Sequence, residues 1–83
     1  MDDHLSTEQL AWVLGRSAGS VRDEIKSGKI EATRIPQGFR IAKDEVLRLA
    51  GEKVEAEAGR KLSERELERL IDDVIATNEA ASA

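Results

Sequence analysis

The chain has 83 residues, no cysteine and a formal net charge of −4 at pH 7. A chain of this length buries only about two thirds of its unfolded surface, so we expect one small domain of modest stability. Without cysteine, a disulfide framework and a thiolate zinc site are excluded. No apolar run approaches the roughly 20 residues of a membrane span, and the acidic start MDDHLSTEQ is unlike a signal peptide. We therefore expect a soluble cytoplasmic protein.

The charge is divided unevenly along the chain. The segment 14–43 holds seven basic and three acidic residues, a local net charge of +4, whereas the segment from residue 49 onward holds five basic and nine acidic residues, a net of −4. A basic segment confined to one region is typical of a surface that attracts phosphate. Its basic residues are Arg16, Arg22, Lys26, Lys29, Arg34, Arg40 and Lys43.

The first helix is expected at about residues 7 to 14. Ser6 can cap its N-terminus, and Gln9 stands three residues later, where its side chain can return the hydrogen bond. Gly15 can adopt a positive φ and end the helix. Trp12 falls off the apolar face, and we expect it to cover an edge of the core or the tail. The side chains that share the buried face are Leu10, Val13 and Leu14.

A second helix is expected at about residues 18 to 27. Ser17 can cap it, Val21 and Ile25 point inward at a spacing of four, and Gly28 can stop it. Only two residues separate the helices after the glycine of the first, which is the length of a helix-turn-helix connection. The exposed face of this helix carries Ala18, Gly19, Arg22, Asp23 and Lys26.

A small β-hairpin is expected next, because KIEATRI and FRI flank the turn residues Pro36-Gln37-Gly38. If those three residues form the loop, Arg34 lies directly opposite Arg40. Like charges facing each other across strands are destabilising, so an anion would relieve the pair. Phe39 is expected to fill the core beneath the hairpin.

Two helices are expected in the remainder of the chain. One begins at about residue 43 and reaches residue 50 or beyond, with Val46, Leu47 and Ala50 spaced to cover the first two helices. The segment 51–62 either extends this helix or forms a linker. Ser63 and Glu66 predict a capping box for a second helix at 63–77, and 78–83 is expected to fray. Its apolar stripe consists of Leu67, Leu70, Ile71 and Val74. The stripe can pack on its own domain, on another copy or on a heterologous protein. We favour a protein partner and place self-association first.

The stretch LSTEQLAWVLGRSAGSVRDEIKSGKIEATRIPQGFRIAKDEVLRL resembles the excisionase-type and MerR-type small winged helix-turn-helix domains of bacteria and their phages. The pieces that carry the resemblance are LST, the LG before the turn, Ser17, SGKI, and the R-I and aromatic-R-I on either side of the hairpin turn. The resemblance implies a mainly α fold with a small β-hairpin, a recognition helix at 18–27 and a wing at 34–40. Members of the family act as recombination directionality factors, transcription regulators or antitoxins bound to a toxin.

The expected organisation is therefore a winged helix-turn-helix domain at 1–50, a linker or helix extension at 51–62, an interaction helix at 63–77 and a frayed terminus at 78–83. Double-stranded DNA is the expected partner, and the location is cytoplasmic and nucleoid-associated. The candidate DNA contacts are Ser20, Arg22, Lys26, Lys29, Arg34, Gln37 and Arg40. The candidate protein-interaction residues are Leu67, Leu70, Ile71 and Val74.

Two alternatives stay open. The chain can be an antitoxin or adaptor whose last helix binds a heterologous protein. It can also be a pure protein-interaction module, because Gly19 weakens the second helix and Asp23-Glu24 place carboxylates on or beside its expected reading face. We expect Asp23 to pair with a neighbouring basic side chain. The other interpretation is that its carboxylate accepts a hydrogen bond from a cytosine amino group.

Catalysis is not expected from this sequence. His4 is the only histidine and lies near the terminus, so neither a metal site nor a Ser-His pair can be assembled around it. No glycine-rich loop follows a strand and precedes a helix, which leaves no site for nucleotide phosphates. We therefore expect no enzyme activity, no cofactor, no metal, no membrane association and no small-molecule substrate.

Overall fold

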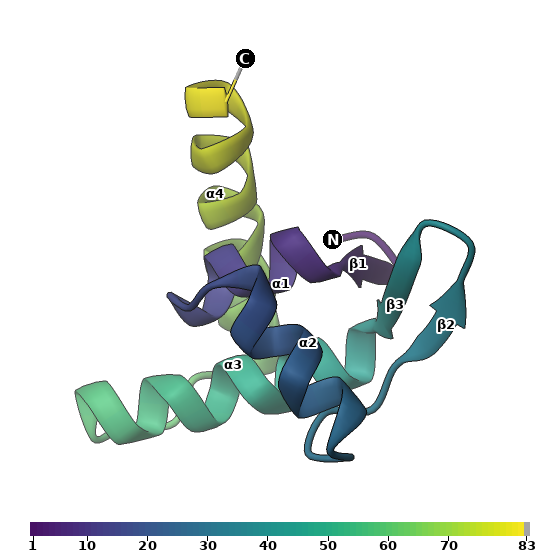
Figure 1. Cartoon of the computed structure of the whole chain (residues 1–83). Coiled ribbons are helices and arrows are strands. Elements are labelled where there is room, and N and C mark those ends of the chain that lie inside the picture. Colours follow the sequence, from purple (N-terminus) through teal and green to yellow (C-terminus); the bar gives the residue numbers. More distant parts are fainter. Residues whose placement is uncertain (83) are drawn as a thin grey trace.

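The computed structural model describes residues 1–82, which form a small, mainly helical fold of four helices and a three-stranded antiparallel sheet (Figure 1). The elements follow the order β1 (His4–Ser6), α1 (Thr7–Leu14), α2 (Ala18–Lys26), β2 (Thr33–Ile35), β3 (Gly38–Ala42), α3 (Lys43–Ala58) and α4 (Glu64–Ser82). Ala83, part of the terminus that was expected to fray, lies outside the described residues.

Helices α1 and α2 begin and end through local hydrogen bonds that the sequence predicts. The capping box of α1 is confirmed, because the Ser6 Oγ accepts from the Gln9 N–H at 3.2 Å and the Gln9 Oε1 accepts from the Ser6 N–H at 3.0 Å. Gly15 then ends α1 with a left-handed φ of 66°. The Ser17 Oγ caps α2 by accepting from the Ser20 N–H at 3.1 Å. Both caps fix the short connection between the two helices.

The hairpin register differs from the expected one. Gly38 belongs to β3 and pairs with Ile35, so the loop consists of Pro36 and Gln37 alone. Its φ of 135° suits glycine, which lets the chain re-enter the strand directly after the loop.

This register places Arg34 opposite Phe39, and Arg40 opposite Thr33. Directly paired residues point to the same face of a sheet, and neighbouring residues along a strand point to opposite faces. The two arginines therefore lie on opposite faces, and the prediction that they oppose each other is wrong. No like-charge repulsion between them has to be relieved.

Strand β1 completes the sheet, in the order β1-β3-β2, and was not predicted. Leu5 pairs with Ile41, and both side chains are buried. One face of the sheet thus closes the core, while Thr33 and Arg40 on the other face are exposed.

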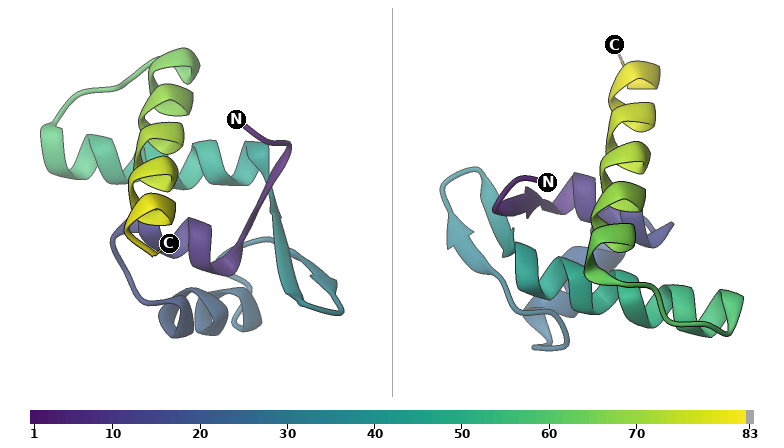
Figure 2. Two further views of the ribbon diagram at one scale, coloured as in Figure 1. Left: turned by 90° about the horizontal axis from the view of Figure 1, so that it is seen from above. Right: turned by 180° about the vertical axis from the view of Figure 1, so that it is seen from behind.

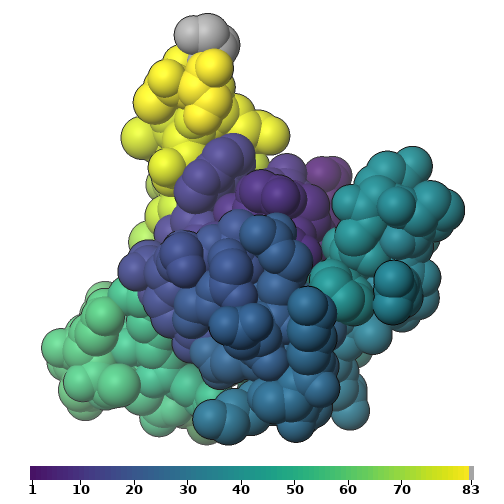
Figure 3. All heavy atoms as spheres, viewed as in Figure 1, coloured from purple at the N-terminus to yellow at the C-terminus, as the bar shows by residue number. Residues whose placement is uncertain are grey.

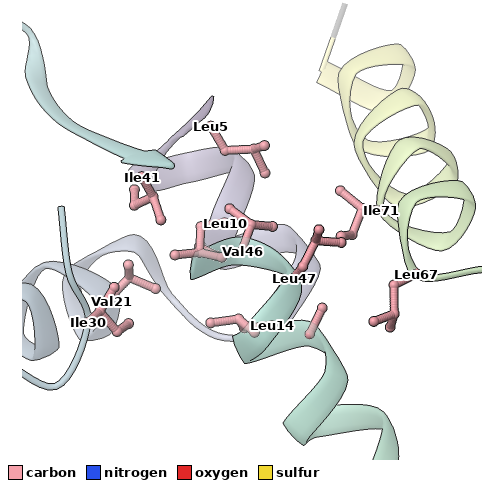
Figure 4. Close-up of a cluster of buried hydrophobic side chains, with 12 residues drawn as sticks. Leu5, Leu10, Leu14, Val21, Ile30, Ile41, Val46, Leu47, Leu67 and Ile71 are labelled. Atoms are coloured by element: carbon pink, nitrogen blue, oxygen red, sulfur yellow. The ribbon is translucent and has the colours of Figure 1, made fainter. Parts of the chain in front are cut away.

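Within residues 1–82, the buried apolar side chains form one cluster to which all four helices contribute (Figure 4). The expected inward residues Val21 and Val46 are fully buried, and Ile25 is packed against the cluster. Phe39 is half-buried and lies outside it, so the prediction that Phe39 fills the core is wrong. Trp12 is half-buried and is not packed against the cluster, so of its two expected positions the one at an edge of the core is wrong. The cluster consists of Leu5, Leu10, Ala11, Leu14, Val21, Ile30, Ile41, Val46, Leu47, Ala50, Leu67 and Ile71.

Both C-terminal helices are longer than the minimum that the sequence predicts. Helix α3 continues to Ala58, so most of the segment 51–62 is helix extension, and Gly59 ends it with a φ of 70°. The capping box of α4 is confirmed by hydrogen bonds between Ser63 and Glu66 in both directions. Helix α4 reaches Ser82, so the expected end near residue 77 is wrong. The helix continues because the alanine-rich tail has high helix propensity.

Helix α4 packs on α1 and α3 of its own domain, and its C-terminal end stands away from the other elements (Figures 1 and 2). Leu67 and Ile71 are buried in the core, whereas Val74 is half-buried and Leu70 is 41% exposed. The apolar stripe of this helix is therefore divided between its own core and the surface.

Candidate nucleic-acid interface

Helix α2 and the β2–β3 hairpin lie side by side on one face of the molecule (Figure 3). A groove of about 330 Å³ runs between them. Arg22 and Lys26 line it from α2, and Arg34 lines it from β2 with Phe39 beside it on β3. The groove is thus bordered by three cations from α2 and from the strand that follows it in the chain.

The local structure explains why these three cations converge. Arg22 and Lys26 are four residues apart, so they lie on the same side of α2, next to the buried face marked by Val21. Arg34 points to the same face of the hairpin as Phe39, which is the face that closes the core through Ile41 further along β3. The two-residue loop therefore decides that Arg34, and not Arg40, faces α2.

Part of the basic segment is neutralised within the fold. Arg16 forms an ion pair with Glu24. Lys43 Nζ lies 2.9 Å from Glu68 Oε1, and this hydrogen bond raises the pKa of Lys43. These two cations connect elements of the fold and are not free to bind an anion.

The cations of the groove are less engaged. Arg22 Nη1 lies 3.8 Å from Glu8 Oε1, with both side chains largely exposed, which makes the pair weak. In the part of the chain that the structure describes, no carboxylate lies within 4 Å of the charged groups of Lys26 or Arg34. The same holds for Lys29, which lies in the turn after α2, and for Arg40.

Arg40 occupies the other face of the hairpin. It lines a separate hollow of about 760 Å³ beside the start of α3, together with Thr33, Asp44 and Arg48. The hairpin therefore carries one arginine on each face and the exposed Gln37 at its tip. Ser20 is half-buried on the side of α2 away from the groove, next to its capping partner Ser17. The predicted contacts thus surround the hairpin and α2 without forming one patch.

A buried carboxylate that was not predicted holds the hairpin in place. Glu45, in the first turn of α3, is 9% exposed. Its Oε2 accepts from the Glu31 N–H at 2.9 Å, and Arg48 donates to its two oxygens at 2.8 and 2.7 Å. These bonds lower the pKa of Glu45, the Arg48 bond being the main cause. The connection from α2 to β2 is thereby fastened to α3. Only the Glu45–Arg48 spacing of three could have been found in the sequence.

No group of three or more His, Asp or Glu side chains is arranged to hold a metal ion within residues 1–82. Nor do the described helices include one long and apolar enough to cross a membrane. Comparison of the chain with protein-family models, with curated proteins and with solved structures gave no match.

Proposed function

We propose that the chain is a noncatalytic protein that binds double-stranded DNA through a winged helix-turn-helix architecture. In this proposal α2 is the recognition helix, the β2–β3 hairpin is the wing, and α1 supports α2 across the short turn. The resemblance of the sequence to excisionase-type and MerR-type domains favours a role in recombination directionality or transcription control. Such a role is cytoplasmic and nucleoid-associated.

The groove between α2 and the hairpin is the observation that supports this proposal. It is lined by Arg22, Lys26 and Arg34, and its cations have at most one weak ion pair within the fold. Guanidinium and ammonium groups that lack carboxylate partners bind phosphate oxygens, and a helix beside them fits the major groove of DNA. The rest of the chain carries a net negative charge, which repels phosphate and so limits such binding to this face.

The proposal is tested by mapping the bound surface. Isotope-labelled protein is titrated with a duplex of mixed sequence, and amide shift changes are followed by NMR. We expect the changes to concentrate in α2, the Lys29 turn and residues 33–40, while the exposed face of α4 around Arg65 stays unaffected. Changes centred on α4, or no changes at low salt, would contradict the proposal.

A second candidate function rests on Leu70, which is 41% exposed beside Val13, Val54 and Val74 in a small hollow between α1, α3 and α4. This surface can serve cooperative assembly on DNA or binding of a heterologous protein by an antitoxin or adaptor. Removing the tail cannot separate these roles, because Leu67 and Ile71 belong to the core. Leu70→Glu keeps the core intact. Loss of cooperative binding to duplexes with adjacent sites would favour self-assembly, and unchanged cooperativity would favour the adaptor.

A further inference from the structure

Gly19 lies in the first turn of α2, where nothing within the fold requires glycine. The residue is exposed, and it is not among the glycines with positive φ. A Cβ built on it would meet only the Ser17 Oγ, at an ordinary contact distance of 3.9 Å. Glycine is the least favourable helix residue after proline, so its presence here is unexplained by conformation or packing. Glycine also occurs where a backbone must come close to a ligand.

Asp23, one turn further along α2, is exposed and without a partner. Two basic residues of the same region are paired with other carboxylates, Arg16 with Glu24 and Arg22 weakly with Glu8. Across residues 1–82, no cation lies within 4 Å of the Asp23 carboxylate, and its side chain makes no hydrogen bond. The expectation that Asp23 pairs with a neighbouring basic side chain is therefore wrong.

Helix geometry places both residues on the outermost line of α2. Asp23 follows the fully buried Val21 by two residues, a rotation of about 200°, so it points almost directly away from the core. Gly19 precedes Asp23 by four residues and lies on the same line. Arg22 and Lys26 are on the flank that borders the hairpin groove.

This arrangement separates two kinds of contact. Phosphates attract the flanking cations and repel a carboxylate, so Asp23 is not suited to the DNA backbone. In the major groove, the exocyclic amino groups of cytosine and adenine are the hydrogen-bond donors, and a carboxylate pairs typically with the N4 amino group of cytosine. A glycine on the same line leaves room for the helix backbone to come close to the base edges.

We propose that Gly19 and Asp23 form the base-contacting ridge of α2, and that the Asp23 carboxylate accepts a hydrogen bond from the N4 amino group of a cytosine. This inference rests on the proposed function and adds a base preference to it. At a site without that cytosine, the Asp23 carboxylate has no hydrogen-bond donor and is repelled by base acceptor groups and nearby phosphates. Asp23 therefore weakens binding to such sites.

The test is selection from a pool of duplexes with a randomised central segment, carried out with the wild-type chain, Asp23→Ala and Asp23→Asn. We expect the wild-type sites to share a cytosine at one position. Asp23→Ala should lose the preference at that position alone, with discrimination falling by roughly tenfold. Asp23→Asn should shift the preference there towards adenine, with which asparagine forms two hydrogen bonds. Asp73→Ala removes the same charge from the exposed face of α4 and is the matched control.

Gly19→Ala supplies an independent measurement. It should leave the thermal stability of the free protein unchanged or higher, and weaken binding to the selected duplex by roughly tenfold. An identical selected motif for wild type and Asp23→Ala would overturn the inference and leave DNA binding itself standing. A wild-type chain that enriches no duplex and shows no salt-dependent binding to the pool would overturn the proposed function as well.

Discussion

Glu45 shows how a single side chain can position a candidate binding surface, the groove between α2 and the hairpin, that it does not line. Its carboxylate joins the first turn of α3 to the Glu31 N–H in the connection between α2 and β2. Arg48 balances the charge through two short hydrogen bonds. The angle between α2 and the hairpin, and with it the groove, therefore depends on a contact between residues 14 apart in the sequence.

With glutamine in place of Glu45, the free energy of unfolding should decrease less as the pH falls than it does in the wild-type chain. The folded-state pKa of Glu45 is lowered, so its stabilising contribution is complete above the unfolded-state pKa of about 4.3 and is lost as the pH falls through the lower, folded value. Glu45→Gln removes this contribution and should cost about 1 to 3 kcal/mol at neutral pH. The check is urea unfolding from about pH 6 to about pH 3, where the wild-type and variant curves should converge.

Glu55→Gln, at an exposed site on the same helix, is the control for this experiment. Glu66 and Glu68 also have lowered pKa values and contribute with the same sign, so the difference between wild type and variant isolates Glu45. A difference that stays constant with pH would show that the charge of Glu45 does not stabilise the fold.

At the scale of elements, α4 contributes to the core along one side and to the surface along the other. Ile71 is fully buried against α1 and α3, whereas Leu70 is 41% exposed. Neighbouring residues of the same apolar stripe therefore differ in burial. Leu67 and Ile71 belong to the core and Ile75 packs against it, whereas the outer part of the stripe at Leu70 is exposed.

Ile71→Ala should destabilise the isolated chain by about 2 to 5 kcal/mol, because it leaves a cavity in the packed cluster. Leu70→Ala is the matched control and should cost less than about 1 kcal/mol, since its side chain already contacts solvent. Both values come from urea unfolding followed by circular dichroism. Equal losses for the two variants would mean that α4 does not pack on its own domain.

The features that could be predicted from the sequence are those set by neighbouring residues. Ser6 with Gln9 and Ser63 with Glu66 form capping boxes as predicted, and Gly15 ends α1 through its own backbone conformation. Helix periodicity likewise identified Val21 and Val46 as core residues. In each case the interaction spans a few residues, so the local pattern contains the information.

The features that could not be predicted depend on how the strands pair. Strand β1 exists because Leu5 pairs with Ile41, and three residues of sequence do not indicate a strand. The hairpin register turned on whether Gly38 belonged to the loop, and that one position decided whether Arg34 faces Arg40 or α2. Of the candidate site, the residue types were accessible from the sequence, but their grouping into a groove was not.

At the scale of the whole molecule, three cations without strong ion pairs line the groove between α2 and the hairpin, and Arg40 lies on the other face of the hairpin. The chain as a whole carries −4, and most of the excess acidic residues lie on α3 and α4. Other cations, such as Arg16 in its ion pair with Glu24, are held within the fold and are not free to bind a polyanion. A protein with this distribution should approach a polyanion in one orientation, with its acidic helices turned away.

The most direct test of DNA binding at this face is the salt dependence of binding to a duplex of mixed sequence. Each neutralised phosphate contributes about −0.9 to the slope of log K against log salt, so the three cations of the groove predict a slope of about −2.7, and all five candidate cations together would give at most about −4.5. These cations are Arg22, Lys26, Lys29, Arg34 and Arg40. Arg34→Ala should make the slope shallower by about 0.9, and Arg65→Ala on α4 should leave it unchanged. A slope near zero, or an equal effect of the two substitutions, would contradict DNA binding at this face.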